Sequence, residues 1–297
     1  MRFDLGIAHK WIYDVDFINM IEEIFHYFGK TTFLVSLHNV DEVYGLIERG
    51  ELYFDNYLDR ASDEDERFSA LANLITRQET YIINQYDLID NAIDKAKMHE
   101  KLLKAGVSVP PSIIFPTYET KPEIKISKAS LNKLGSPFVI KPCYYSGGGD
   151  GVNTNAKDFN DIQVLRKEYY DDRIIAQQKI KAINLGEFKA WFRVFYSFEN
   201  VIPFLWDDET HIYFEDNLHL VNQSIIDEII NISSTIAEIT GMDYFSSEFA
   251  LTEEGKLYII DYVNDQCDMR LKSLHRDGVP DSAVRQFIHD MKDYLES

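Results

Sequence analysis

The sequence has little cysteine: Cys143 and Cys267 are its only two. They form no Cys-x-x-Cys pair, so the sequence indicates neither a disulfide framework nor a zinc site. No apolar run approaches the roughly 18 residues that a membrane-spanning helix needs. The first residues have neither the cationic start nor the cleavage site of a signal peptide. We therefore expect a cytoplasmic protein without a membrane partner.

Positive charge is also scarce. The chain has 30 lysines and arginines against 50 aspartates and glutamates, which gives a formal net charge of −20. Nucleic acids and anionic membranes bind basic surfaces, so neither is an expected partner. An anionic substrate such as a nucleotide would need lysines, arginines or a metal ion gathered at its own site.

Several common catalytic motifs are missing. The eight histidines are dispersed and form no His-Glu-x-x-His pattern. No Ser-His-Asp or Cys-His arrangement can be identified from the sequence. The content of 45% hydrophobic and 13% aromatic residues is nevertheless typical of a globular protein. A chain of 297 residues is long enough for two or three packed subdomains.

The first part of the chain, residues 1–88, alternates short apolar runs with amphipathic segments, which predicts a small parallel α/β layer. No Gly-x-Gly-x-x-Gly pattern follows the first apolar run, so a dinucleotide-binding layer is not indicated. We expect this domain to act as a lid or as a substrate-binding platform. The expected strands are residues 3–8, 31–37 and 81–84, and the expected helices are residues 15–27, 40–49 and 66–74.

The remaining chain combines helices with strands that follow each other directly, which predicts α+β subdomains. The expected helices are residues 91–105, 159–170, 224–240 and 280–296. The expected strands are residues 137–142, 173–180, 190–198, 201–206, 245–251 and 256–263.

The last two of these strands form a predicted hairpin that carries acidic residues. The turn at residues 253–256 separates Glu248 from Asp261 and would bring the two carboxylates side by side. Two carboxylates and a nearby amide oxygen, such as that of Asn264, suit a hard cation that prefers oxygen ligands, such as Mg²⁺. The alternative is an exposed hairpin with ordinary acidic side chains.

A glycine-rich segment follows the strand at residues 137–142. Its glycines would let main-chain N–H groups approach an anion closely, and phosphate is the usual ligand of such loops. Lys141 lies at the end of the preceding strand, where its ammonium group would reach the same anion. Glycine-rich hairpin connections are common, so the lysine strengthens an otherwise weak signal. The loop residues that we assign to the nucleotide are Ser146, Gly147, Gly148 and Gly149.

Four segments, taken in order, resemble the ATP-grasp superfamily. They are Asp94-Lys95 with the helix that runs to Pro110-Pro111, the strand with its glycine loop, residues 173–180, and the acidic hairpin. The resemblance covers residues 91–270 and is closest to the carboxylate–amine ligases of the glutathione synthetase, D-alanine–D-alanine ligase and RimK-like group. It implies an α/β (α+β) fold in which a small N-terminal α/β layer, residues 1–88, precedes two α+β subdomains, residues 89–180 and 181–297, that sandwich ATP.

The resemblance also implies roles for individual residues. Lys95 and Lys141 correspond to two nucleotide-contacting lysines, and Arg193 corresponds to the arginine that faces the transferring phosphoryl group. Glu187 corresponds to a ribose-binding carboxylate. Glu248, Asp261 and Asn264 correspond to the ligands of one or two Mg²⁺ ions, for which Mn²⁺ can substitute. The adenine hinge corresponds to Gln178, Lys179 and Ile180, although many relatives have Glu in place of Gln178.

The chain departs from the family pattern at the metal site. The usual amide follows the second carboxylate by two residues, whereas Asn264 follows Asp261 by three. Because side chains alternate along a strand, Asn264 and Asp261 would point to opposite faces. A bulge at Tyr262-Val263 would bring them together, or Asp265 could take the place of Asn264.

The resemblance implies an ATP-dependent carboxylate–amine ligase that acts through an acyl phosphate and forms an amide or peptide-type bond. The alternatives are an ATP-grasp kinase or phosphotransferase and a non-catalytic nucleotide-binding module. The expected partners are small-molecule or peptide substrates, and a homodimer is expected because relatives often dimerise. Arg270 could pair with a substrate carboxylate, and Tyr145 could close over bound substrates. Equally, Arg270 could pair with Asp268 and Tyr145 could simply pack.

Overall fold

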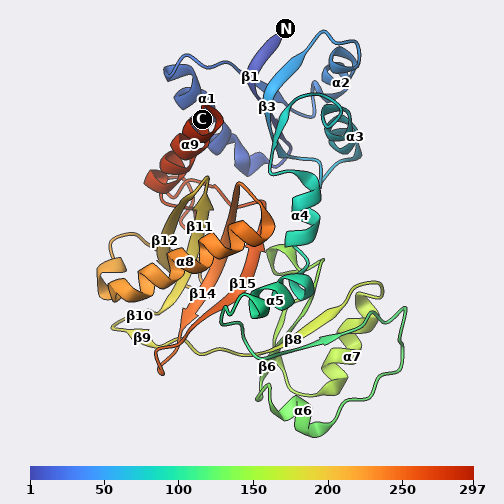
Figure 1. Ribbon diagram of the computed structural model, residues 1–297, viewed down its shortest axis with the longest axis vertical. Helices are drawn as coiled ribbons and strands as arrows, with labels where there is room; N and C mark the ends of the chain where they lie inside the picture. Colours follow the sequence, from blue (N-terminus) through green and yellow to red (C-terminus); the bar gives the residue numbers. More distant parts are fainter.

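The computed structural model describes residues 1–147 and 149–297. In this part of the chain, a parallel sheet of four strands at the N-terminal end is followed by an antiparallel sheet of four strands and another of five (Figure 1). One antiparallel sheet lies beside the N-terminal layer and the other lies at the far end of the molecule.

The N-terminal sheet has the strand order β2-β1-β3-β4, and every adjacent pair is parallel. The predicted parallel α/β layer is thereby confirmed. Its strands are β1 (Arg2–His9), β2 (Thr32–Val35), β3 (Tyr53–Arg60) and β4 (Tyr81–Ile83). Its helices are α1 (Val15–Tyr27), α2 (Val40–Glu48) and α3 (Glu66–Ile75).

Strand β3 was not predicted, although it lies between β1 and β4 in the sheet. Its sequence contains polar and charged residues that interrupt the apolar pattern expected of a central strand. The structure gives these groups partners. The Asn56 amide donates to the main-chain oxygen of Asp4 at 2.9 Å, and the buried Arg60 guanidinium is paired with Asp14.

The middle of the chain forms an antiparallel sheet with the order β5-β8-β6-β7. The central pair, β6 and β8, was predicted, whereas the outer strands β5 and β7 were not. The strands are β5 (Ser112–Phe115), β6 (Phe138–Pro142), β7 (Asn153–Ala156) and β8 (Ile174–Gln178), and the helices are α6 (Lys128–Asn132) and α7 (Phe159–Glu168).

The C-terminal part forms a five-stranded antiparallel sheet with the order β13-β12-β11-β14-β15. A short ribbon of β9 and β10 precedes it. The strands are β9 (Asn184–Leu185), β10 (Phe188–Lys189), β11 (Trp191–Ser197), β12 (Asn200–Trp206), β13 (Tyr213–Phe214), β14 (Tyr244–Leu251) and β15 (Leu257–Asn264), and helix α8 spans Gln223–Thr240.

Helix α8 covers one face of this sheet (Figure 1). Its isoleucines, such as Ile232 and Ile236, share a core with Phe192 of β11 and Phe249 of β14. The helix ends at Gly241, whose φ of +72° is a conformation that glycine adopts without steric cost. None of the helices in the described residues is long and apolar enough to cross a bilayer.

Helix α9 (Asp281–Leu295) packs with α1 and the other face of the five-stranded sheet. Its Phe287 ring contacts Phe17 of α1 and Tyr244 of β14, with ring centroids 6.0 and 5.2 Å apart. Helices α4 (Tyr86–Ala92) and α5 (Lys95–Lys104) connect the N-terminal sheet to the middle sheet. Met98 and Leu102 of α5 share the core of the five-stranded sheet. The domain limits at residues 88 and 180 stay a prediction.

Candidate functional site

The face of the five-stranded sheet opposite α8 carries a charged pair. Because Phe192 and Phe249 pack beneath α8, side-chain alternation places Arg193 and Glu248 on the opposite face. The two residues are direct partners in the β11–β14 register. The Arg193 Nη1 atom donates to the Glu248 Oε1 atom at 2.6 Å. The sheet therefore presents a charge-assisted pair on the side away from α8.

The predicted acidic hairpin is present, and Glu248 on β14 pairs with Asp261 on β15. The pairing is irregular on both sides of Asp261. Glu248 and Phe249 are adjacent on β14, but their partners Asp261 and Ile259 are two residues apart on β15. This extra residue turns Asp261 toward Glu248 while Ile259 stays in the core beneath α8.

A second irregularity brings Asn264 to the same place. Ser246 and Glu248 are two residues apart on β14. Their partners Asn264 and Asp261 are three residues apart on β15, so β15 contains one extra residue here. The Asn264 Nδ2 atom donates to the Asp261 Oδ2 atom at 3.0 Å. This is the bulge at Tyr262-Val263 that the sequence required if Asn264 was to join Asp261.

Two lysines from other elements reach Asp261. Lys141 comes from the end of β6, and its Nζ atom lies 3.3 Å from the Asp261 Oδ1 atom. Lys95 is the first residue of α5, and its Nζ atom lies 3.9 Å from the same oxygen. Both lysine side chains are more than nine-tenths buried. Two segments distant in sequence therefore bring positive charge to the acidic hairpin.

These charges control the protonation of the two carboxylates. Burial alone would raise the pKa of Asp261, but the ammonium groups of Lys95 and Lys141 outweigh it and hold that pKa well below its usual range. For Glu248, burial dominates and raises the pKa, although the Arg193 guanidinium opposes the shift. Asp261 is therefore the more firmly ionised of the two carboxylates.

The residues present fit a hard divalent cation. Two carboxylates and the amide of Asn264 supply oxygen donors from one hairpin, which is the donor chemistry that Mg²⁺ prefers. The buried Nε atom of Arg193 has no hydrogen-bond partner among the described residues, so its N–H can donate to an anion such as a phosphate oxygen. Within those residues no group of three or more His, Cys, Asp and Glu could hold a metal. The third donor must therefore be the amide or a ligand.

The glycine-rich loop is anchored at its entry. The main-chain N–H groups of Tyr144 and Tyr145 donate to one Asp172 oxygen at 2.7 and 3.1 Å. The buried Ser146 hydroxyl donates to the main-chain oxygen of Pro142 at 2.8 Å, so it turns back toward β6. Gly147 and Gly149 are exposed, and Gly148 lies outside the described residues. The Gly149 N–H donates to the Ser146 main-chain oxygen at 3.3 Å, so this donor is engaged within the loop.

Among the described residues, those predicted to bind adenine and ribose make no hydrogen bond or ion pair with this cluster. Gln178 ends β8, where its N–H donates to the Pro111 oxygen at 2.9 Å, and Lys179 and Ile180 follow it. Because β8 pairs with β6, the hinge segment continues from the sheet that carries Lys141. Glu187 is exposed in the turn between β9 and β10.

The two predicted substrate residues differ in their surroundings. Arg270 is engaged, because its Nη2 atom lies 2.7 Å from Asp268 and 2.9 Å from Asp277. This is the pairing that competes with a role in substrate recognition. Tyr145 is half exposed, and its ring packs edge-on against Tyr144. The Tyr144 hydroxyl donates to Asp90 at 2.9 Å.

Four residues near the cluster were not identified from the sequence. The Trp191 indole N–H donates to Glu248 at 3.3 Å. The Tyr262 hydroxyl receives a hydrogen bond from Gln177 at 2.8 Å and contacts the His99 Nδ1 atom at 2.7 Å. Trp191 could have been found, because it precedes Arg193 by two residues on one strand face. Long-range contacts among the other three leave no local sequence signal.

We expect His99 to make the protein less stable in mild acid. Burial lowers the pKa of its imidazole below the ordinary value, with a smaller effect from Lys141. Below about pH 6.5 the unfolded chain takes up a proton that the folded chain does not, so stability falls as pH falls. The melting temperature of His99→Gln should therefore decrease less than that of the parent between about pH 7.5 and pH 5.5. The exposed His38→Gln is the control, and an identical decrease in His99→Gln and parent would contradict the prediction.

The architecture defines the class of fold as ATP-grasp, as the comparisons with solved structures show. The chain is similar to D-alanine–D-alanine ligase from Bacillus anthracis complexed with ATP, with a TM-score of 0.67, 14% identity and 99% of each chain covered. It is similar to a RimK domain ATP-grasp protein from Sphaerobacter thermophilus, with a TM-score of 0.63, 16% identity and 100% of each chain covered.

A third similar structure is the macrocyclase MdnC bound with precursor peptide MdnA from Microcystis aeruginosa, with a TM-score of 0.63, 11% identity and 100% of each chain covered. Neither the protein-family models nor the curated proteins give a match to this sequence. The predicted resemblance to the ATP-grasp superfamily and the predicted fold class are confirmed at the level of fold.

Proposed function

We propose that this protein is an ATP-dependent ligase that joins a carboxylate to an amine through an acyl phosphate and releases ADP and phosphate. The observation that carries the proposal is a local excess of positive charge. Two lysines and Arg193 meet the two carboxylates of one hairpin, in a chain whose net charge is −20. Such a cluster meets the need of an anionic nucleotide for its own local cations.

The cluster and its surroundings account for the parts that ATP needs. We assign Lys95 and Lys141 to the phosphates and Arg193 to the phosphoryl group in transfer, because phosphoryl transfer depends on charge stabilisation and alignment. The exposed glycine loop would add main-chain N–H groups to the phosphates. The adenine is assigned to Gln178, Lys179 and Ile180, the ribose to Glu187, and the loop contacts to Ser146, Gly147, Gly148 and Gly149.

The metal is assigned to the hairpin. Glu248, Asp261 and Asn264 would hold one or two Mg²⁺ ions, and the hydrogen bond between Asn264 and Asp261 supports Asn264 over Asp265 as the third residue. Bound there, Mg²⁺ would neutralise charge on the phosphate oxygens. Trp191 and Arg193 hold the Glu248 carboxylate in place by their contacts at 3.3 and 2.6 Å. These contacts orient the carboxylate, and they partly offset the effect of burial, which raises the pKa of Glu248.

The proposed reaction has two steps that this charge cluster can assist. A carboxylate oxygen of the acid forms a bond to the γ-phosphorus, and the bond from that phosphorus to the ADP oxygen breaks. The amine nitrogen then forms a bond to the acyl carbon, phosphate leaves, and the amine loses a proton. Arg193 on β11 and Lys141 on β6 can stabilise the negative charge of the phosphoryl group during the first step.

The names of the structural neighbours support this class of substrate. They include D-alanine–D-alanine ligase and a macrocyclase bound with a precursor peptide. We propose a small molecule or a peptide as the acid and amine substrates of this protein. Cytoplasmic location and a homodimer stay predictions. Arg270 contributes to the substrate site only if the substrate displaces Asp268 or Asp277.

The proposal is tested by ADP release from MgATP with hydroxylamine present, across pools of amino acids, small carboxylates and peptides. Hydroxylamine intercepts an acyl phosphate, so the expected result is a hydroxamate of one acid together with ADP and phosphate. ADP release with a phosphorylated hydroxyl and no hydroxamate would instead show a kinase. MgATP binding without turnover in every pool would favour a non-catalytic nucleotide-binding module.

A further inference from the structure

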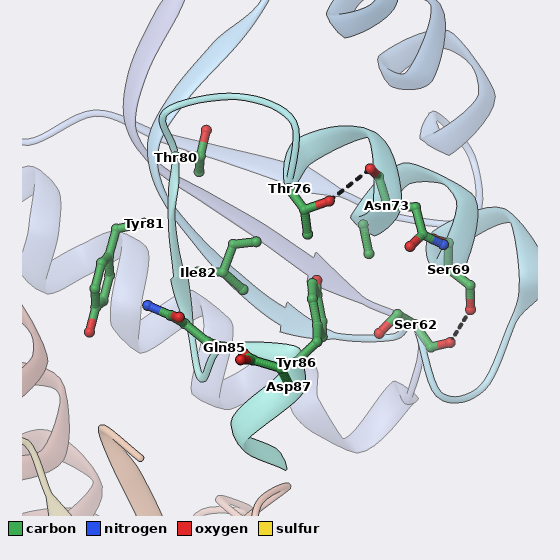
Figure 2. Close-up of a pocket in the computed structure, with 11 residues that line it drawn as sticks. Ser62, Ser69, Asn73, Thr76, Thr80, Tyr81, Ile82, Gln85, Tyr86 and Asp87 are labelled. Atoms are coloured by element: carbon green, nitrogen blue, oxygen red, sulfur yellow. Dashed lines mark hydrogen bonds between the residues drawn. The ribbon is translucent and has the colours of Figure 1, made fainter. Parts of the chain in front are cut away.

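A cavity of about 600 Å³ lies in the N-terminal layer, between β4, α3 and the start of α4 (Figure 2). Figure 2 shows Ile82 of β4 and Tyr86 of α4 beside the side chains of α3. None of the described residues that line this cavity belongs to the charge cluster of the ligase site. Arg193 lies instead among side chains of the five-stranded sheet, and these side chains determine how its guanidinium is held.

The ring of Trp206 lies against the Arg193 guanidinium. Trp206 ends β12, which pairs with β11, and its neighbour Leu205 packs beneath α8. Side-chain alternation therefore places Trp206 on the sheet face that carries Arg193. The Arg193 Cζ atom lies 5.5 Å from the centroid of the Trp206 ring. This distance is within the roughly 6 Å over which a cation and an aromatic ring face attract each other.

Trp206 is itself held firmly. It is only 7% exposed. The His211 ring stacks on it with centroids 5.1 Å apart and an interplanar angle of 15°, and the centroid of the Tyr213 ring lies 6.4 Å away. A ring packed in this way has little room to turn. It therefore gives the guanidinium a fixed surface on which to lie.

The indole N–H of Trp206 does not stabilise the fold. Its Nε1 atom is buried and has no hydrogen-bond partner among the described residues, although a buried tryptophan N–H usually has one. An unpaired buried donor destabilises the folded state, and a phenylalanine at this position would avoid that effect. Of the aromatic side chains, however, tryptophan attracts a cation most strongly. The contact with Arg193 therefore accounts for the residue type better than stability does.

The contact with a ring face leaves N–H groups of Arg193 available. The buried Arg60 is held by hydrogen bonds, because it donates to both Asp14 oxygens and to the Cys267 main-chain oxygen. Among the described residues, Arg193 donates to Glu248 alone, through Nη1. A ring face attracts the guanidinium through its charge and uses no N–H donor. The other N–H groups of Arg193, including that of the unpartnered Nε atom, can therefore donate to phosphoryl oxygens.

We propose that Trp206 is a positioning residue of the ligase, whose ring holds the Arg193 guanidinium in the direction of the phosphoryl group in transfer. This role rests on the proposed function, which assigns Arg193 to that group. Without the ring, Arg193 would keep its charge but would be free to turn away from the transition state. Lys95 and Lys141 would still bind the phosphates of MgATP. Loss of Trp206 should therefore lower kcat and leave the KM for MgATP nearly unchanged.

The test compares Trp206→Leu, which removes the ring face, with Trp206→Phe, which keeps a smaller one. Phe287→Leu is the matched control, because it shortens a buried aromatic side chain of the same core, whose ring contacts include Phe17 and Tyr244. Heteronuclear NMR follows the Nε–H proton of Arg193, which is assigned by its loss in Arg193→Lys. A proton above a ring face is displaced upfield. Turnover is measured as ADP release from MgATP, with the acid identified by the hydroxamate assay and hydroxylamine as the nucleophile.

The Arg193 signal is expected upfield in the parent, less displaced in Trp206→Phe, and at its ordinary position in Trp206→Leu. The kcat of Trp206→Leu should fall at least about tenfold, as expected for a misplaced group at the reacting centre. Its KM for MgATP should stay within about threefold of the parent. Trp206→Phe should recover most of the loss, and Phe287→Leu should keep the parental kcat.

An Arg193 signal at its ordinary position in the parent would overturn the proposal, even if Trp206→Leu did not fold. Equal losses of kcat in Trp206→Leu and Phe287→Leu would overturn it too, as would parental kcat in folded Trp206→Leu. No turnover by the parent with any pool would count against the ligase itself. The NMR signal would then still show whether Trp206 holds Arg193.

Discussion

Glu248→Gln is expected to abolish MgATP turnover while the protein stays folded. The substitution keeps the size of the side chain and removes the charge that faces Arg193 at 2.6 Å and stands beside Asp261 in the hairpin. Charge stabilisation at such a site contributes several kcal/mol, which corresponds to a loss of at least about 10² to 10³ in rate. Asp261→Asn is expected to have a similar effect, because it also leaves Lys95 and Lys141 without their shared partner.

The measurement is steady-state ADP release with the acid identified by hydroxamate formation, together with Mn²⁺ binding followed by electron paramagnetic resonance. Glu253→Gln is the matched control, since Glu253 is an exposed carboxylate in the turn of the same hairpin. It should retain parental turnover and parental Mn²⁺ affinity. Turnover by Glu248→Gln within about twofold of the parent, a difference near 0.4 kcal/mol, would show that Glu248 is not a metal ligand.

The best sequence predictions came from strong local patterns. The apolar spacing at residues 15–27 and 224–240 gave helices that match α1 and α8 almost residue for residue. The hairpin was predictable because its short turn brings Glu248 opposite Asp261. Even the bulge was foreseeable, because Asn264 could reach Asp261 only if a residue was added to β15.

Other parts of the fold depend on partners far away in sequence. Strand β3 was missed because Asp59 and Arg60 look unsuited to a central strand, yet their partners, the Tyr86 hydroxyl and Asp14, come from other elements. No local residue pattern predicts the shift in strand pairing that places the Asp261 and Ile259 side chains on opposite faces of the sheet. The Tyr262 contacts with Gln177 and His99 join three elements that only the tertiary structure brings together.

Hydrogen bonds from Asn84 attach the N-terminal layer to the five-stranded sheet. The Asn84 Oδ1 atom accepts from the N–H groups of Asp243 and Tyr244 at 2.7 and 3.1 Å, and its Nδ2 atom donates to the Tyr244 oxygen at 2.8 Å. The Tyr81 hydroxyl donates to Asp243 as well. These contacts join β4 and the residue after it to the start of β14, so they hold the N-terminal layer in place relative to the five-stranded sheet.

Asp14→Asn is expected to destabilise the protein by about 3–5 kcal/mol, the usual cost of removing one partner from a buried ion pair. Arg60 donates to both Asp14 oxygens at 2.9 and 2.7 Å, and the two side chains are only 4% and 3% exposed. Burial alone would lower the pKa of Arg60, but the charge of Asp14 raises it. Without Asp14, the buried guanidinium keeps its charge and loses its counter-ion.

The urea midpoint of Asp14→Asn should therefore fall strongly, whereas the exposed pair of Arg2 and Asp55 should contribute little, so Asp55→Asn is the control. The double variant Asp14→Leu with Arg60→Met removes both charges and should recover much of the loss. Arg60 also donates to the Cys267 oxygen at 3.0 Å, in the segment that follows Asn264. If the pair also positions that segment, the double variant should regain stability without regaining full MgATP turnover. Recovery of both stability and MgATP turnover would show that the pair of Asp14 and Arg60 contributes to stability alone.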